Sequence, residues 1–147
     1  MHTEHQTSEP SRFEKREQIC SIIGHGIDMV SIEWMRLELE STTKSWLGQF
    51  FSTDERAAAD QPSVHIRYYA GRFAGKEAVA KALGTGFAND ITWRGIEILR
   101  KESGAPYVKL SNEVKAFAES LGITEWFISI SYSGDLAYSS VIAIGND

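Results

Sequence analysis

The segment from Val64 to Leu83 most strongly limits what this chain can fold into, because it is typical of one long helix. It is rich in alanine, contains no proline and ends before Gly84, a residue that commonly terminates helices. Gly71 and Gly75 lie inside it, although glycine lowers helix stability. Their spacing of four places both on one face of the helix. We therefore expect this face to pack closely against a neighbouring helix or strand.

Shorter elements are predicted on both sides of the long helix. Before it come an apolar strand over residues 20–30, a helix over residues 31–50 and a second helix starting at Ser52, with Glu55 at the spacing of a capping box. After it come strands over residues 91–98, 106–110, 126–131 and 136–144, with a helix from Ser111 to Gly122 between them. Helices and strands do not alternate as in a doubly wound sheet. We predict an α+β fold, with a mainly antiparallel sheet packed against the long central helix.

The length of 147 residues fits a single domain. Residues 1–19 are polar and charged without periodicity, so we expect a disordered leader followed by one domain over residues 20–147. No apolar stretch is long enough to cross a bilayer, no signal peptide is recognisable, and Cys20 is the single cysteine. We expect a cytoplasmic protein with no membrane partner. The net charge of −5 argues against nucleic acid as a partner, because nucleic-acid binders are usually basic.

Asp28 is a carboxylate inside an otherwise apolar strand. Burying a charge is costly unless something compensates it. The side chain could cap the helix that follows the strand. It could also be compensated by an arginine or a metal ion. The spacing alone leaves both interpretations open.

The long helix carries a group of charged residues that also allows two interpretations, a surface ion pair or a binding site. Glu77 and Lys81 are four residues apart and share a face, which fits a solvated ion pair of little energetic value. Three features favour a phosphate site instead: flanking alanines that suggest partial burial, the nearby basic residues Arg72 and Lys76, and a glycine turn directly after Lys81. Mg²⁺ commonly takes one or two carboxylates together with ligand phosphates. Asp28 and Glu77 are candidates for those carboxylates.

Several segments, in order, resemble blocks of a known family. Gly24-His25-Gly26-Ile27-Asp28-Met29-Val30 resembles the opening strand of holo-(acyl-carrier-protein) synthases, which are small 4′-phosphopantetheinyl transferases. The segment Arg72-Phe73-Ala74-Gly75-Lys76-Glu77-Ala78-Val79-Ala80-Lys81-Ala82-Leu83-Gly84-Thr85-Gly86 is similar to their central signature. Later blocks match at Trp93, Ile96-Glu97-Ile98, Gly104-Ala105-Pro106 and Ser129-Ile130-Ser131. The resemblance extends from about Ile22 to Ile144.

The resemblance implies the fold of that family and a transferase that moves 4′-phosphopantetheine from coenzyme A to a serine of an acyl carrier protein, releasing adenosine 3′,5′-bisphosphate. It implies that Asp28 and Glu77 coordinate Mg²⁺, and that Lys81 contacts the phosphate near the transfer point. Glu77 and Lys81 would be the catalytic residues, with Glu77 or a metal-bound water as the base. The implied contacts to coenzyme A come from Arg72, Lys76, Lys81, Gly84, Thr85 and Gly86. Short chains of this family form trimers, so a homotrimer with sites at subunit interfaces is expected.

The sequence departs from the family pattern at two places. Tyr132 stands where many members have a histidine, and tyrosine cannot act as a base at neutral pH. The helix after Asp28 is usually basic and docks an acidic carrier, whereas here it carries several glutamates. We therefore hypothesise an unusual carrier protein, contacted through Trp34 and Met35. A non-catalytic module that binds coenzyme A or a nucleotide is the alternative function.

Overall fold

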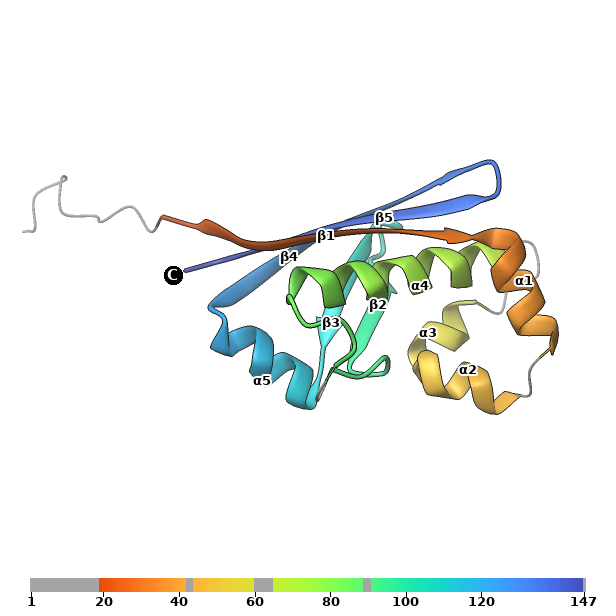
Figure 1. Cartoon of the computed structure of the whole chain (residues 1–147), viewed down its shortest axis with the longest axis horizontal. Helices are drawn as coiled ribbons and strands as arrows, with labels where there is room; N and C mark the ends of the chain where they lie inside the picture. The colour runs from red at the N-terminus through yellow and green to blue at the C-terminus, as the bar shows by residue number, and fades with distance from the viewer. Residues whose placement is uncertain (1–18, 42–43, 60–64, 89–90, 147) are drawn as a thin grey trace, which may run out of the picture.

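The computed structural model describes residues 19–41, 44–59, 65–88 and 91–146 (Figure 1). Except for Ile19, the predicted leader lies outside these residues. The first half of the chain forms β1 (Ser21–Ser31), α1 (Ile32–Ser41), α2 (Lys44–Phe50), α3 (Thr53–Ala58) and α4 (His65–Ala82). The second half forms β2 (Ile96–Arg100), β3 (Pro106–Leu110), α5 (Asn112–Ser120), β4 (Ile123–Ser133) and β5 (Leu136–Gly145). The predicted mixture of helices with antiparallel strands is confirmed.

Helix α4 is the central element, and the other elements surround it (Figure 1). β1 approaches it so closely that a Cβ atom on Gly24 or Gly26 would overlap the backbone of α4. The predicted close face of α4 is confirmed, since added Cβ atoms on Gly71 and Gly75 would press against side chains of β4. Alanine and glycine thus let strands pack directly onto the helix backbone.

The three-stranded sheet has the order β1-β5-β4, and all its neighbours are antiparallel. Successive side chains of a strand point to opposite faces. Since Gly24 and Gly26 face α4, Asp28 points to the same side of β1. Ile27 and Met29 point to the other face of the sheet, where both are exposed. The strand therefore delivers one carboxylate to the helix side of the sheet.

Two predicted elements differ from the structure. The single helix predicted over residues 31–50 is two helices, α1 and α2, with residues 42–43 outside the described part of the chain. The strand predicted from Ile91 begins only at Ile96. In the segment before Ile96, the hydroxyl of Thr92 accepts a hydrogen bond from the Gly95 amide at 3.1 Å and stabilises a turn. Such local side-chain bonds compete with an extended strand.

Two helix boundaries show how local signals were borne out. The capping box at α3 is confirmed, because the Glu55 amide donates to the Ser52 hydroxyl and the Ser52 amide donates to the Glu55 carboxylate. Helix α5 starts where it was predicted, with Ser111 as its N-cap residue, although the Ser111 side chain makes no capping hydrogen bond. Gly122 follows α5 with φ +83°, a conformation that favours glycine.

Candidate active site

The charged residues of α4 separate onto two faces of the helix. Phe73, Glu77 and Lys81 follow one another at spacings of four and share one face. Arg72 and Lys76 share a different face, one residue behind. The first face borders a cavity beside β1, and the second is buried in the protein. The basic residues Arg72, Lys76 and Lys81 are close in the sequence but therefore do not form one site.

Asp28 and Lys81 meet across β1 and α4. The Nζ atom of Lys81 donates hydrogen bonds to Asp28 Oδ1 at 2.9 Å and to the carbonyl oxygen of Ile27 at 3.0 Å. The side chain of Asp28 is 19% exposed and that of Lys81 is 50% exposed. The charge of Asp28 is thus compensated by a lysine while it still faces solvent.

Asp28 does not cap α1, which removes one interpretation left open by the sequence. The amide of Trp34 donates to the hydroxyl of Ser31 at 3.0 Å. The amide of Glu33 donates at 2.9 Å to Asp135, in the turn between β4 and β5. These two side chains satisfy the start of the helix and leave Asp28 free for the pocket.

Glu77 lies on the pocket face of α4, one turn before Lys81. The ion pair of Lys81 is with Asp28, so the surface pair Glu77–Lys81 that the spacing allowed is not formed as a salt bridge among the described residues. Burial raises the pKa of the Glu77 carboxyl, the neighbouring Asp28 raises it further, and Lys81 partly offsets both effects. Two carboxylates therefore face one region in which the charge of Glu77 is poorly stabilised.

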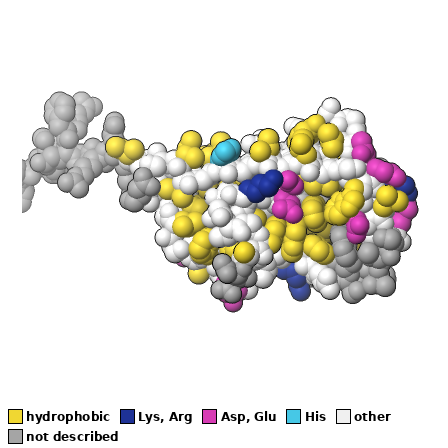
Figure 2. All heavy atoms as spheres, viewed as in Figure 1, with side chains coloured by type: hydrophobic (Ala, Val, Ile, Leu, Met, Phe, Trp, Pro, Cys, Tyr) yellow, Lys and Arg dark blue, Asp and Glu magenta, His cyan; other side chains and the backbone are white. Residues whose placement is uncertain are grey.

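The cavity at this place has a volume of about 510 Å³ and is lined by Asp28, Met29, Val30, Ser31, Trp34, Phe73, Glu77 and Lys81. Acidic and basic side chains lie next to each other in the middle of this face, bordered by hydrophobic side chains (Figure 2). Trp34 and Phe73 form an aromatic wall, with ring centroids 5.3 Å apart. The pocket thus combines two carboxylates, one ammonium group and an apolar side.

The donor set fits Mg²⁺ bound together with a phosphorylated ligand. Within the described residues, no group of three or more His, Cys, Asp or Glu side chains could hold a metal ion by itself. Mg²⁺ does not require such a group, since it commonly takes one or two carboxylates and completes its shell with phosphate oxygens and water. Asp28 and Glu77 meet this requirement.

The predicted phosphate contact of Lys76 does not fit its position. Its side chain is fully buried and pairs with the equally buried Glu55 at 2.7 Å. Its Nζ atom also donates to the carbonyl oxygens of Trp93 and Ile96. Burial lowers the pKa of Lys76 and raises that of Glu55, and their mutual attraction opposes both shifts. All donors of Lys76 are used inside the fold, so it ties α4 to α3 and the start of β2.

Arg72 is also buried, at 4% exposure, and its guanidinium lies over the ring of Tyr68 at 4.3 Å. Neither Arg72 nor Lys76 lines the pocket that contains Asp28 and Glu77. Arg72 and Lys76 are four residues apart, and so are Glu77 and Lys81. This spacing assigns each pair to its own face of the helix and could have separated the two pairs from the sequence alone.

The turn Gly84-Thr85-Gly86 follows α4 and lies outside the lining of the pocket. Gly84 and Gly86 have positive φ angles, of +80° and +58°. Their amides already donate to the carbonyl oxygens of Lys81 and Ala80, and the Thr85 hydroxyl donates to the carbonyl oxygen of Gly86. The amides of the two glycines are therefore already bonded within the fold.

Tyr132 does not line the pocket either. Its ring lies under the Arg67 guanidinium at 4.7 Å, and its hydroxyl group abuts Gly71 of α4. Met35 is 0% exposed and belongs to the core, so the predicted carrier contact through Met35 is wrong. Trp34 is 40% exposed and remains available.

Three residues that stabilise or line this part of the molecule were not predicted as such from the sequence. Phe73 lines the pocket, Asp135 bonds the start of α1, and Glu55 pairs with Lys76 on the other face of α4. Asp135 and Glu55 act on partners far away in the sequence, and no local pattern marks such contacts. Phe73 could have been found from its spacing of four before Glu77.

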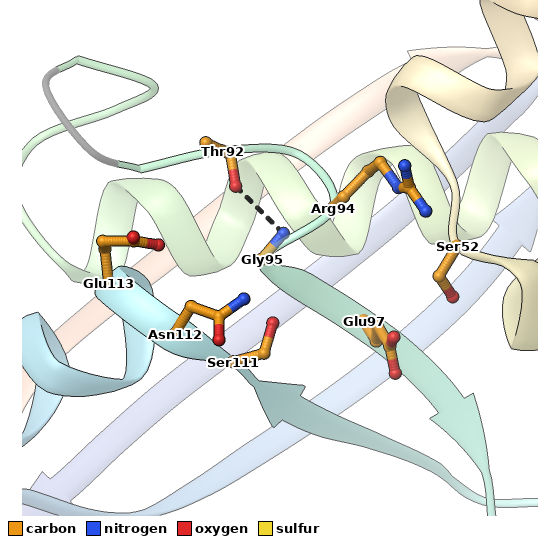
Figure 3. A pocket seen from close by; sticks show the side chains of 8 residues that line it. All are labelled: Ser52, Thr92, Arg94, Gly95, Glu97, Ser111, Asn112 and Glu113. Carbon is orange, nitrogen blue, oxygen red and sulfur yellow. Dashed lines mark hydrogen bonds between the residues drawn. The ribbon is translucent and has the colours of Figure 1, made fainter.

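A second cavity, of about 360 Å³, opens between the start of α3, the loop before β2 and the start of α5 (Figure 3). Its lining is polar and consists of Ser52, Thr92, Arg94, Gly95, Glu97, Ser111, Asn112 and Glu113. None of the predicted site residues is among them. The chemistry predicted from the sequence therefore belongs to the first pocket.

Comparison with known proteins places this geometry in a family. The family model of the 4′-phosphopantetheinyl transferase superfamily matches residues 24–136. The chain belongs to this superfamily. One relative is the holo-[acyl-carrier-protein] synthase of Solidesulfovibrio magneticus. It is 40% identical to this chain over 124 residues, which cover 84% of this chain and 99% of the relative. That of Alkaliphilus metalliredigens is 41% identical over 122 residues, with 83% and 98% covered.

Solved structures of the superfamily agree with the sequence comparison. The holo-[acyl-carrier-protein] synthase of Neisseria meningitidis superposes with a TM-score of 0.78 at 29% identity, covering 84% of this chain and 98% of the other. The Helicobacter pylori enzyme in complex with coenzyme A gives 0.70 at 30% identity, covering 81% and 98%. The resemblance to holo-(acyl-carrier-protein) synthases and the transferase fold predicted from it are confirmed.

Proposed function

We propose that this chain transfers 4′-phosphopantetheine from coenzyme A to a serine of an acyl carrier protein. The observation that carries the proposal is the convergence of Asp28, Glu77 and Lys81 in one pocket of a chain from this superfamily. The names of its relatives describe this activity for those proteins, and one solved neighbour binds coenzyme A.

In the proposed reaction the serine oxygen of the carrier attacks the phosphorus atom that bears the pantetheine. A new phosphorus–oxygen bond forms to the serine, and the bond to the bridging oxygen of the pyrophosphate breaks. Adenosine 3′,5′-bisphosphate leaves with the electron pair of that bond. The serine proton passes to Glu77 or to a water molecule. The pocket contributes mainly by positioning the groups and stabilising charge.

Asp28 and Glu77 are the residues that would hold Mg²⁺. When bound, the ion would supply positive charge to the pyrophosphate oxygens. Lys81 holds Asp28 in place through its hydrogen bond, and its exposed ammonium group would neutralise charge on the leaving phosphate. Coenzyme A would contact Lys81. It would also contact the turn of Gly84, Thr85 and Gly86, through groups other than the two glycine amides, which are bonded within the fold. Arg72 and Lys76 are left out of this set because both are buried on another face of α4.

We also propose that the chain assembles as a homotrimer. The sheet face opposite α4 carries exposed apolar side chains, namely Ile22, Ile27 and Met29 on β1, Ile142 on β5 and Phe127 on β4. Contiguous exposed apolar surface commonly marks an interface. Light scattering coupled to size-exclusion chromatography tests this assembly, since a monomeric mass at micromolar concentration would contradict it.

The transfer itself is tested by incubating the protein with coenzyme A, Mg²⁺ and several apo carrier proteins. We expect one carrier to gain the mass of phosphopantetheine and an equal amount of adenosine 3′,5′-bisphosphate to be released. Binding of coenzyme A without modification of any carrier would contradict the proposal and favour a non-catalytic binding module.

A further inference from the structure

We propose that Ser139, on β5, positions the carboxylate of Asp28 by donating a hydrogen bond to it. The inference rests on the proposed function, because Asp28 is one of the two residues proposed to hold Mg²⁺. Ser139 does not line the pocket itself. It acts on the metal site through Asp28, from the neighbouring strand of the sheet.

Ser139 lies directly beside Asp28 in the three-stranded sheet. The two residues are partners in the register of the antiparallel strands β1 and β5. Side chains of such partners point to the same face of a sheet, with Cβ atoms about 4.5–5.5 Å apart. Since Asp28 points to the side of the sheet that faces α4, Ser139 points there as well. Rotation about one side-chain bond therefore brings the Ser139 hydroxyl group within reach of the Asp28 carboxylate.

The hydroxyl group of Ser139 is an exception on its face of β5. The buried side chains of this strand alternate along it and belong to Ala137, Ser139, Val141 and Ala143. Ser139 is 1% exposed, and its Oγ atom has no hydrogen-bond partner within the part of the chain that the structure describes. A buried hydroxyl group without a partner destabilises a fold, and alanine would fit the same row without this effect. Packing therefore does not explain the hydroxyl group, and the ionised acceptor beside it is Asp28.

The Asp28 carboxylate has an oxygen atom available for this hydrogen bond. Lys81 donates to Oδ1 at 2.9 Å, and none of the described residues donates to Oδ2. An ionised carboxylate offers about four lone-pair sites, so Oδ2 can accept from Ser139 while the carboxylate still ligates a cation. A hydrogen bond to an ionised acceptor is also roughly twice as strong as one between neutral groups. Lys81 and Ser139 thus hold one oxygen atom each and fix the orientation of the carboxylate.

The test removes the hydroxyl group with Ser139→Ala, which keeps a small side chain against α4. Ser140→Ala is the matched control, because Ser140 is the next residue of β5, is exposed and points to the opposite face. Mn²⁺ is titrated in the presence of coenzyme A and followed by electron paramagnetic resonance, with coenzyme A alone as the blank. We expect Ser139→Ala to weaken Mn²⁺ binding by about 10- to 100-fold and Ser140→Ala to leave it unchanged. Equal affinities of the two variants would overturn the role of Ser139.

Thermal unfolding in EDTA separates positioning of Asp28 from a structural role of Ser139. In the metal-free protein, Ser139→Ala removes a buried hydroxyl group that has no partner, so its Tm should equal that of the wild type or exceed it by up to about 4 °C. Weaker Mn²⁺ binding combined with an unchanged or higher Tm supports the proposal. A lower Tm in EDTA would show that the hydroxyl group stabilises the fold instead, and would overturn it.

Asp28→Asn, measured in the same titration, separates a failure of this inference from a failure of the proposed metal site. Neither turnover nor a carrier protein is needed for this comparison. If the wild type binds Mn²⁺ and Asp28→Asn does not, unchanged binding by Ser139→Ala overturns the role of Ser139 alone. If the wild type does not bind Mn²⁺, or if Asp28→Asn binds it equally well, the assignment of Asp28 as a ligand is wrong and the role of Ser139 is overturned with it.

Discussion

The Nζ atom of Lys81 donates a hydrogen bond to Asp28 Oδ1 at 2.9 Å and so joins two residues that lie 53 positions apart in the sequence. This bond connects the strand that carries Asp28 to the helix that carries Glu77. It fixes the relative position of the two carboxylates proposed to hold the metal ion.

Replacing Lys81 by methionine should therefore impair catalysis much more than stability. The ion pair is substantially exposed, and exposed pairs contribute at most about 1 kcal/mol to the free energy of unfolding. We expect kcat for carrier modification to fall by roughly 10²-fold or more, because a charge that stabilises the transition state is lost. Steady-state kinetics and thermal unfolding of Lys81→Met, with Lys81→Arg as the variant that keeps the charge, measure both effects. A loss of folding equal to the loss of activity would contradict this role.

Glu77→Gln should stabilise the metal-free protein at neutral pH while removing Mg²⁺ binding. Burial and Asp28 raise the pKa of Glu77, so the folded protein binds this proton more tightly than the unfolded chain does. The contribution of Glu77 to stability is therefore largest below its unfolded pKa and is lost as pH rises through the folded pKa. Unfolding in EDTA is measured at several pH values. The free energy of unfolding of the variant should increase relative to that of the wild type as pH rises. A constant difference across pH would contradict the raised pKa.

The raised pKa of Glu77 also predicts how metal binding depends on pH. A protonated carboxyl cannot ligate Mg²⁺, so affinity should fall as pH is lowered. The fall should begin at a higher pH than an ordinary glutamate would give. Titration with Mn²⁺ followed by electron paramagnetic resonance measures this affinity without requiring turnover. An affinity that is independent of pH down to the ordinary glutamate range would count against Glu77 as a ligand.

The buried pair of Glu55 and Lys76 should matter for folding rather than for coenzyme A. Glu55→Gln leaves the buried ammonium group of Lys76 without its counter-charge, which typically costs about 3–5 kcal/mol. Lys76→Met leaves a buried carboxylate and should cost a similar amount. The double variant should lose less than the sum of the two, as a double-mutant cycle in urea would show. Full additivity would mean that the two side chains do not interact.

Alanine substitutions at two glycines with different surroundings test how closely β1 packs on α4, with the second glycine as a control. Gly26→Ala should strongly destabilise the protein, because the new Cβ atom would overlap the Ala78 carbonyl oxygen. Gly48 in α2 has open space around it, so Gly48→Ala should stabilise by about 0.5–1 kcal/mol through helix propensity. Thermal unfolding of both variants measures the contrast.

The sequence predicted the long helix, the antiparallel strands and the capping box, since each depends on spacing and local residue preferences. It also predicted Asp28, Glu77 and Lys81 as site residues, the first two mainly through ordered family blocks. It did not separate Arg72 and Lys76 from the site, because basic residues clustered in sequence were not assigned to helix faces. The pairs Lys81–Asp28 and Lys76–Glu55 depend on chain folding over long separations, and no local pattern encodes them.

The most direct measurement is the intact mass of an apo carrier protein after incubation with coenzyme A, Mg²⁺ and either the wild type or Glu77→Gln. The exposed Glu119, changed to Gln, is the matched control. We predict that the wild type and the control add one phosphopantetheine to the carrier and that Glu77→Gln adds none while it remains folded. Modification by Glu77→Gln at the wild-type rate, or no modification by the wild type of any carrier, would contradict the proposed active site.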